Sequence, residues 1–208
     1  MRKKKYFVFA GILIIIVVLP LISYLLVKKG YDLRVNATYS QRFDSAGTTQ
    51  LPDYSFLSHR GDTISSTNMQ GKVLVIELVS KNCADDSLKL RHPLFELQED
   101  YKNKTRRLRI LSVITDSVFN TAELQAYASR FAARDEWHVL GGAISTLNPV
   151  LRFYENYLQE KNIGNANLLC PENVLLIDKE GIVRGAYNIY SPQEFSDLYN
   201  DVLYLIDK

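Results

Sequence analysis

An apolar run at residues 73–79 is followed closely by a cysteine. The strand that this run predicts, with the cysteine after it, constrains the fold of the whole domain more than any other feature of the sequence. The run reads Val-Leu-Val-Ile-Glu-Leu-Val, and only Glu77 interrupts it. A short run that is rich in β-branched residues predicts a central strand covered on both faces. Lys81 and Asn82 break the run just before Cys83. Because a buried acid needs a polar partner, Glu77 is expected to have one, although the sequence does not identify it.

A helix is predicted to begin at or just after Cys83. Asp85 and Asp86 are acidic residues of the kind that suits a first helical turn. Apolar residues then follow at helical spacing: Leu90, Leu94, Leu97 and Tyr101. The backbone N–H groups of a helix start favour a thiolate at Cys83, whereas the two aspartates oppose it. Pro93 lies inside the helical pattern and is expected to kink or restart the helix.

Residues 6–27 carry no charge and are almost wholly apolar. As a helix they span about 33 Å at 1.5 Å per residue, which is enough to cross a bilayer. The run is longer than the apolar part of a signal peptide, and neither a small-residue cleavage site nor a lipobox cysteine follows it. We expect an uncleaved transmembrane anchor after a basic start at residues 1–5. A polar tether at residues 28–50 and one domain at residues 51–208 are expected to follow.

Basic residues flank the predicted anchor, four at positions 2–5 and two at positions 28–29. The excess on the amino-terminal side favours a cytoplasmic N-terminus, as in a single-pass protein of a bacterial inner membrane with its domain on the periplasmic side. Without these six residues the chain keeps 19 Lys and Arg against 23 Asp and Glu, a net charge of −4. This balance gives no indication of a nucleic-acid partner, which would need a clustered basic face.

Further strands and helices follow from periodicity and turn residues. Strands are predicted, in order, in a hairpin at 51–65 with Gly61 in its turn, at 109–115, at 137–142, and in a second hairpin at 174–178 and 182–187. Helices are predicted from three capping signals, at Asn120, at Asn148 with Pro149 as first helical residue, and at Ser191. Strands that alternate with helices and close with a hairpin and a helix predict an α/β fold with a mixed sheet. This is the thioredoxin-like pattern.

From Leu51 to the C-terminus the chain resembles the Sco/SenC group of thioredoxin-fold proteins. The most telling segments are 137–142, Trp-His-Val-Leu-Gly-Gly, and 175–182, Leu-Leu-Ile-Asp-Lys-Glu-Gly-Ile. The strand into Cys83 and the segment 111–116, Leu-Ser-Val-Ile-Thr-Asp, also match. The resemblance implies an exported domain with an N-terminal membrane anchor. It also implies a role in delivering copper to cytochrome oxidase or in exchanging the thiols of that enzyme.

Members of this group bind copper through a C-x-x-x-C pair and a distant histidine, and this chain departs from that pattern. Cys83 stands at the first cysteine position, Ser87 stands at the second, and Cys170 stands near the place of the histidine. A hydroxyl is a poor ligand for Cu(I), whereas a second thiolate is a good one. The resemblance therefore points to Cys83 and Cys170 as the catalytic and metal-binding residues, with Cu(I) as the possible metal.

Three interpretations of Cys83 and Cys170 stay open. They form a redox or metal-binding thiol pair, a static disulfide that staples the domain, or two unpaired thiols in a protein that has lost the chemistry. The first makes the chain a protein for thiol-disulfide exchange or copper handling, with an envelope client such as a respiratory oxidase or a thiol protein. The alternative is a non-catalytic, membrane-tethered interaction or assembly module, so enzyme activity itself stays open.

The three histidines are interpreted without a metal. His59 falls in a polar turn and is expected to be solvated. His92 lies within the predicted Cys83 helix and is expected to be a surface or capping residue. His138 follows Trp137 in a half-buried stretch and is expected to be a structural histidine with satisfied hydrogen bonds.

Overall fold

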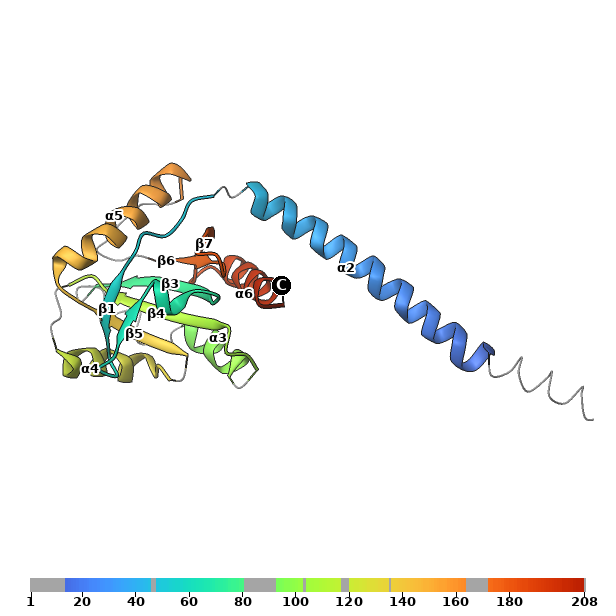
Figure 1. The fold of residues 1–208 in the computed structure, drawn as a ribbon, viewed down its shortest axis with the longest axis horizontal. Helices are drawn as coiled ribbons and strands as arrows, with labels where there is room; N and C mark the ends of the chain where they lie inside the picture. Colours follow the sequence, from blue (N-terminus) through green and yellow to red (C-terminus); the bar gives the residue numbers. More distant parts are fainter. Residues whose placement is uncertain are drawn as a thin grey trace, which may run out of the picture. The chain divides into compact units, whose positions relative to one another are not determined.

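The computed structural model describes residues 14–45, 48–80, 93–102, 104–116, 120–134, 136–163 and 172–207. The chain divides into two compact units, residues 1–45 and residues 46–208. The first unit contains a short π-helix, η1 (Ile14–Val18), and a long helix, α2 (Leu19–Ser45). Figure 1 labels most of the helices and strands of both units.

The first unit does not by itself confirm the predicted anchor. Among the described residues, none of the helices combines the length and the apolar character that a membrane crossing requires. Residues 6–13, the first part of the predicted span, lie outside the described residues. α2 continues past the apolar run into charged sequence and covers most of the segment predicted as a tether, and the second unit begins at Ala46.

The second unit opens with the predicted hairpin. β1 (Ser55–Ser58) pairs antiparallel with β2 (Thr63–Ser65), and Phe56 lies opposite Ile64. Gly61 has a φ of 88° in the turn, a backbone conformation that costs other residues energy. A 3-10 turn, η2 (Thr67–Met69), then leads to the central strands. The hairpin prediction is confirmed.

The central strand is β3 (Val73–Val79), with the bounds that the apolar run predicts. It pairs parallel with β4 (Leu108–Ile114) and antiparallel with β6 (Asn173–Ile177). The remaining strands are β5 (Trp137–Gly141) and β7 (Val183–Asn188). The seven-stranded sheet has the order β2-β1-β5-β4-β3-β6-β7, so the prediction of a mixed sheet in an α/β fold is confirmed.

Helices cover both faces of this sheet, with α5 (Ile144–Glu160) on one side and α3 (Pro93–Tyr101) and α4 (Thr121–Phe131) on the other (Figure 1). α3 contacts α4 through Gln98, whose amide donates to the Ala132 carbonyl. α3 also contacts α6 (Pro192–Asp207), because the Tyr101 hydroxyl donates to the Tyr199 carbonyl. One layer of helices therefore consists of α3, α4 and α6.

Apolar side chains of the sheet and α5 form a single buried cluster. Its most enclosed members come from β4, β5, β6, β7 and α5. Those that are 1% exposed or less are Leu111, Val113, Leu140, Leu147, Tyr154, Leu175, Ile177 and Val183. Side chains on the other face, such as Val75 and Ile110, are buried as well, so both faces of the strands are covered and the strands read as nearly continuous apolar runs.

The capping signals are confirmed for two helices and wrong for the third. The Asn120 side chain accepts a hydrogen bond from the Glu123 N–H at 2.8 Å, and α6 begins directly after Ser191. α5, however, begins at Ile144 and contains Pro149 in its interior. Leu147 is fully buried on the same helical face as Val150, so the packing of Leu147 adds a turn before the proline.

Candidate functional site at the end of the central strands

The residues that the sequence singles out for chemistry, Cys83 and Cys170, lie outside the described residues, as do Ser87 and His92. Their pairing and their metal binding stay predictions. The described residues define the end of the sheet from which these segments depart.

The chain leaves β3 and enters β6 at the same end of the sheet. The two strands are antiparallel neighbours, with Glu77 opposite Val174, so the carboxyl end of β3 lies beside the amino end of β6. Ser80 is the last described residue after β3 and is buried. The Thr115 N–H donates to the Val79 carbonyl at 2.8 Å and ties the end of β4 to the same place.

Glu77 has the buried polar partner that the sequence requires but does not identify. The Ser112 hydroxyl on β4 donates to Glu77 Oε1, and the Trp137 indole N–H on β5 donates to the Ser112 oxygen at 2.7 Å. All three residues are buried, and Ser112 and Trp137 are 0% exposed. A directed chain of hydrogen bonds thus crosses three neighbouring strands and ends on an acid two residues before the end of β3.

Tyr154 of α5 fixes the start of β6 at this end of the sheet. Its hydroxyl donates to the Asn173 carbonyl. Burial, and secondarily the negative charge of Glu77, raise the pKa of Tyr154 well above its usual range. Tyr154 therefore remains a protonated hydrogen-bond donor, and its side chain packs in the core, where it is 1% exposed.

The histidines of the hairpin and β5 differ from their predictions. His59 is 8% exposed, so the expectation of a solvated side chain is wrong. The hairpin turn folds against β5, where His59 Nδ1 accepts a hydrogen bond from the Val139 N–H at 3.1 Å. His138 is buried, with 7% exposed, but its Nδ1 atom has no hydrogen-bond partner among the described residues, so the expectation of a satisfied structural histidine is wrong as well.

Two arginines make the surroundings of these histidines unfavourable to positive charge. Burial, followed by the positive charge of Arg60, lowers the pKa of His59. Burial, followed by the charges of Arg60 and Arg109, lowers the pKa of His138 to about 4, and Asp62 acts in the opposite direction. The rings are 6.4 Å apart. Within the described ranges, no group of three or more His, Cys, Asp or Glu side chains is arranged to hold a metal ion.

Comparisons with known proteins identify the family and the fold. The family model SCO1/SenC matches residues 44–201. A SCO1/SenC family lipoprotein from Bacillus anthracis has a similar structure, with a TM-score of 0.60 and 21% identity over 76% of this chain and 95% of the other. BsSco, a member of the Sco family of cytochrome c oxidase assembly proteins with a disulfide switch, gives a TM-score of 0.57 and 18% identity over 75% and 92%.

Copper-bound yeast Sco1 is also similar, with a TM-score of 0.58 and 17% identity over 78% of this chain and 96% of the other. No curated protein matches the chain. At these identities the structural likeness shows the thioredoxin-like fold, and the family model carries the family assignment. The resemblance inferred from the sequence motifs is confirmed.

Proposed function

The chain belongs to the SCO1/SenC family, and from this premise we propose that it handles Cu(I) or exchanges disulfides during the assembly of a respiratory oxidase. Cys83 and Cys170 are the proposed working pair. BsSco is described as an oxidase assembly protein with a disulfide switch, and the yeast relative holds copper. Both properties suit a protein that works through two thiols.

The observation that carries the proposal is the juxtaposition of two strand ends. Cys83 follows Ser80 by three residues, and Cys170 precedes Glu172 by two. An extended chain spans at most about 3.6 Å per residue, so each cysteine is tied within roughly 7 to 11 Å of the same end of the sheet. Because β3 and β6 are hydrogen-bonded neighbours, a contact between the two thiols is within reach of the chain.

Two thiols at this place support two linked reactions. The Cys83 thiolate attacks a client disulfide and forms a mixed disulfide, and one client sulfur leaves as a thiolate. Cys170 then attacks Cys83, which releases the second client thiolate and leaves the Cys83–Cys170 disulfide, so two electrons pass to the client. In the reduced protein the same two thiolates suit Cu(I) as cargo, since soft ligands favour this ion.

The proposal also includes a membrane anchor at residues 6–27, with the basic start in the cytoplasm and the domain on the periplasmic side. The uncharged run and the excess of basic residues before it support this arrangement. Resistance of the full-length protein to extraction from membranes by alkaline carbonate tests it, and complete release would remove the anchor from the proposal.

Thiol counting on the full-length protein tests the working pair. The oxidised protein is expected to show no reactive thiol until a mild reductant is added, and two thereafter, without unfolding. The Cys83→Ser variant is expected to retain one reactive thiol throughout. A disulfide that reacts only after denaturation would instead indicate a static staple. Two thiols that stay free under oxidising conditions would favour the alternative, an interaction module without redox chemistry.

A further inference from the structure

A pocket lies at the end of the sheet opposite to the proposed thiol site. It has a volume of about 400 Å³ and opens between the loop before β4 and the start of β5. Lys102, Lys104, Thr105 and Arg106 line it from the first side, and Glu136 and Trp137 line it from the second. Because β3, β4 and β5 are parallel, these amino ends of β4 and β5 lie away from the carboxyl end of β3.

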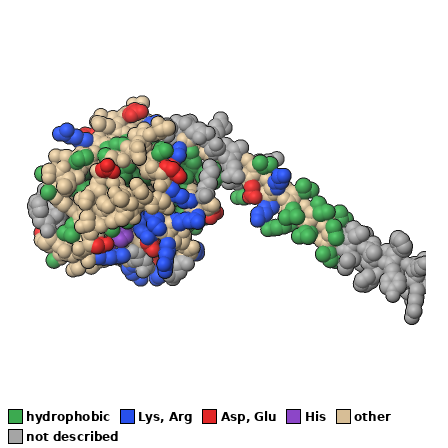
Figure 2. Space-filling view, viewed as in Figure 1, with side chains coloured by type: hydrophobic (Ala, Val, Ile, Leu, Met, Phe, Trp, Pro, Cys, Tyr) green, Lys and Arg blue, Asp and Glu red, His purple; other side chains and the backbone are tan. Residues whose placement is uncertain are grey.

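Positive charge is concentrated at this pocket. Residues 102–109 contain five Lys and Arg and no acid, in a chain that carries a net charge of −4 outside the basic residues at its predicted anchor. Lys and Arg side chains accordingly gather on one part of the visible surface of the second unit instead of spreading evenly over it (Figure 2). Lys102, Lys104 and Arg106 line the pocket and are exposed.

The other two basic residues of this segment, Arg107 and Arg109, already have hydrogen-bond or ion-pair partners. The Arg107 guanidinium donates to the Ile206 carbonyl at 2.8 Å. Arg109 forms an ion pair with Glu136, which is the acidic residue among the described residues that line the pocket. In the described part of the chain, by contrast, the side chains of Lys102, Lys104 and Arg106 make no hydrogen bond or ion pair.

The loop that presents the three cations is held in place. The Arg106 carbonyl accepts a hydrogen bond from Lys72 Nζ at 3.1 Å and another from Arg109 at 2.8 Å. Thr105 Oγ1 accepts from the Arg107 N–H at 3.0 Å, which leaves the hydroxyl hydrogen for a ligand. A backbone fixed in this way reduces the ordering cost of binding.

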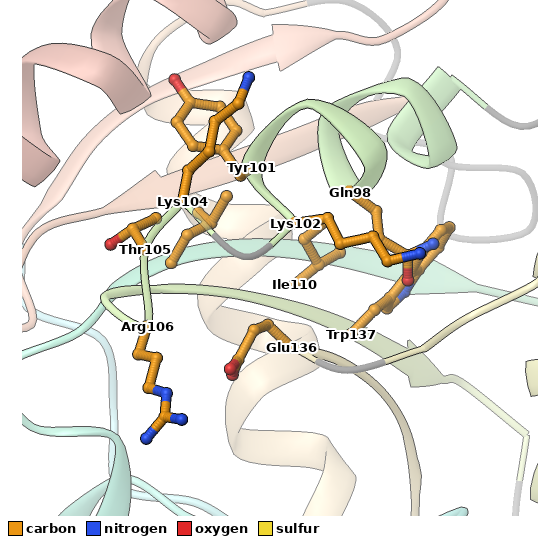
Figure 3. A pocket seen from close by; sticks show the side chains of 10 residues that line it. Gln98, Tyr101, Lys102, Lys104, Thr105, Arg106, Ile110, Glu136 and Trp137 are labelled. Atoms are coloured by element: carbon orange, nitrogen blue, oxygen red, sulfur yellow. The ribbon is translucent and has the colours of Figure 1, made fainter.

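The pocket offers a ligand its exposed cationic side chains but no open indole face. Trp137 lies at the back of the pocket and is 0% exposed, so a ligand cannot stack on its indole ring. Lys104 and Arg106 extend in opposite directions from the loop, and Lys102 reaches across toward Gln98 (Figure 3). Because the three cationic groups point in different directions, each can contact a separate anionic group of one ligand.

We propose that this pocket binds a ligand that carries more than one phosphate group, with Lys102, Lys104 and Arg106 as its cationic contacts and Thr105 as a neutral donor. Phosphates match the charge of three unpaired cations, and the Arg guanidinium suits phosphate geometry. The ligand source is either a soluble oligophosphate compound or a lipid headgroup with two phosphates. The remainder of the ligand extends into solvent, since the back of the pocket is closed.

The test uses tripolyphosphate, added to the full-length protein in a non-ionic detergent and measured by calorimetry. The location of binding is read from the indole N–H resonance of ¹⁵N-tryptophan-labelled protein, because Trp137 is the sole tryptophan and lines the pocket. The lipid source is tested by the same resonance in phosphatidylcholine vesicles with and without cardiolipin. Sodium chloride of equal ionic strength controls for screening.

Two matched triple variants decide the outcome. Lys102→Gln, Lys104→Gln and Arg106→Gln together are expected to weaken binding by about tenfold or more. Arg130→Gln, Arg152→Gln and Lys161→Gln remove the same charge from exposed positions of α4, α5 and the residue that follows α5, and are expected to preserve binding. A response to tripolyphosphate assigns the soluble source, and a response to cardiolipin alone assigns the lipid source. The proposal is overturned if neither probe binds, if sodium chloride shifts the resonance equally, or if both variants weaken binding alike.

Discussion

Ser112 joins two buried polar groups on the strands at either side of β4. Its hydroxyl donates to Glu77 and accepts from the Trp137 indole. Ser112→Ala removes both bonds in a fully buried place, so the free energy of unfolding is expected to fall by about 2 kcal/mol or more. Chemical denaturation measures the change. The control Ser129→Ala, at an exposed serine of α4, is expected to stay within about 0.5 kcal/mol of the parent protein. Equal effects of the two variants would contradict the buried chain.

His138 makes stability depend on pH in a predictable direction. Its pKa in the folded protein is about 4, below the ordinary value of 6.5. As pH falls below 6.5 the unfolded chain gains a proton on His138 and the folded chain does not, so stability is lost between pH 6.5 and about 4. The contribution amounts to about 2 kcal/mol between pH 7 and 5.

His138→Gln is expected to remove this part of the pH dependence, which denaturation curves at the two pH values would measure. Should the variant fold poorly, the imidazole ¹⁵N signals of the parent protein provide a second check. These signals are expected to show a neutral His138 ring at pH 5. A protonated ring at pH 5, or an unchanged pH dependence in the variant, would count against the assignment.

At the scale of elements, α5 contains a proline where a helix interior usually excludes one. Pro149 is the sixth residue of α5 and cannot donate to the Ser145 carbonyl. Pro149→Ala restores that donor but loosens the unfolded chain, so a net gain of about 1–2 kcal/mol in unfolding free energy is expected. Pro192→Ala is the matched control, because Pro192 starts α6, where proline is favourable. Thermal denaturation compares them, and a loss of stability in Pro149→Ala would show that the proline is required.

Elements defined by short-range patterns could be predicted from the sequence, whereas partners set by long-range packing could not. The apolar run gave the bounds of β3, and Gly61 marked the hairpin turn, because each signal lies within a few residues. The capping signal at Asn148 and Pro149 predicted the wrong start for α5, because the burial of Leu147 outweighed this local signal. Local patterns decide where an element forms, and tertiary contacts adjust where it begins.

The candidate site was predictable to a similar degree. The sequence identified Glu77 as an acid in need of a partner, but Ser112 lies 35 positions away and meets it only through the parallel register of β3 and β4. His59 appeared solvated because its neighbours in sequence are polar, and only the fold brings β5 against it. Contacts between distant segments have no signature in a single sequence without the topology.

At the scale of the whole molecule, the two ends of one sheet have different chemistry. One end gathers the carboxyl end of β3 and the start of β6, to which Cys83 and Cys170 are tethered by two or three residues. The other end carries the basic pocket before β4 and β5. The Trp137–Ser112–Glu77 chain runs between them across three strands. A sheet held rigid by two helical layers keeps these ends apart.

We propose that Cys83 and Cys170 form one Cu(I)-binding thiol pair. The most direct test is a Cu(I) titration of the reduced full-length protein against a competing chelator, with X-ray absorption at the copper edge to count sulfur ligands. We expect one tightly held Cu(I) with two sulfur ligands, and we expect Cys170→Ser to leave weak binding with a single sulfur. Copper that is not retained by the parent protein, or a ligand set that Cys170→Ser leaves unchanged, would contradict it.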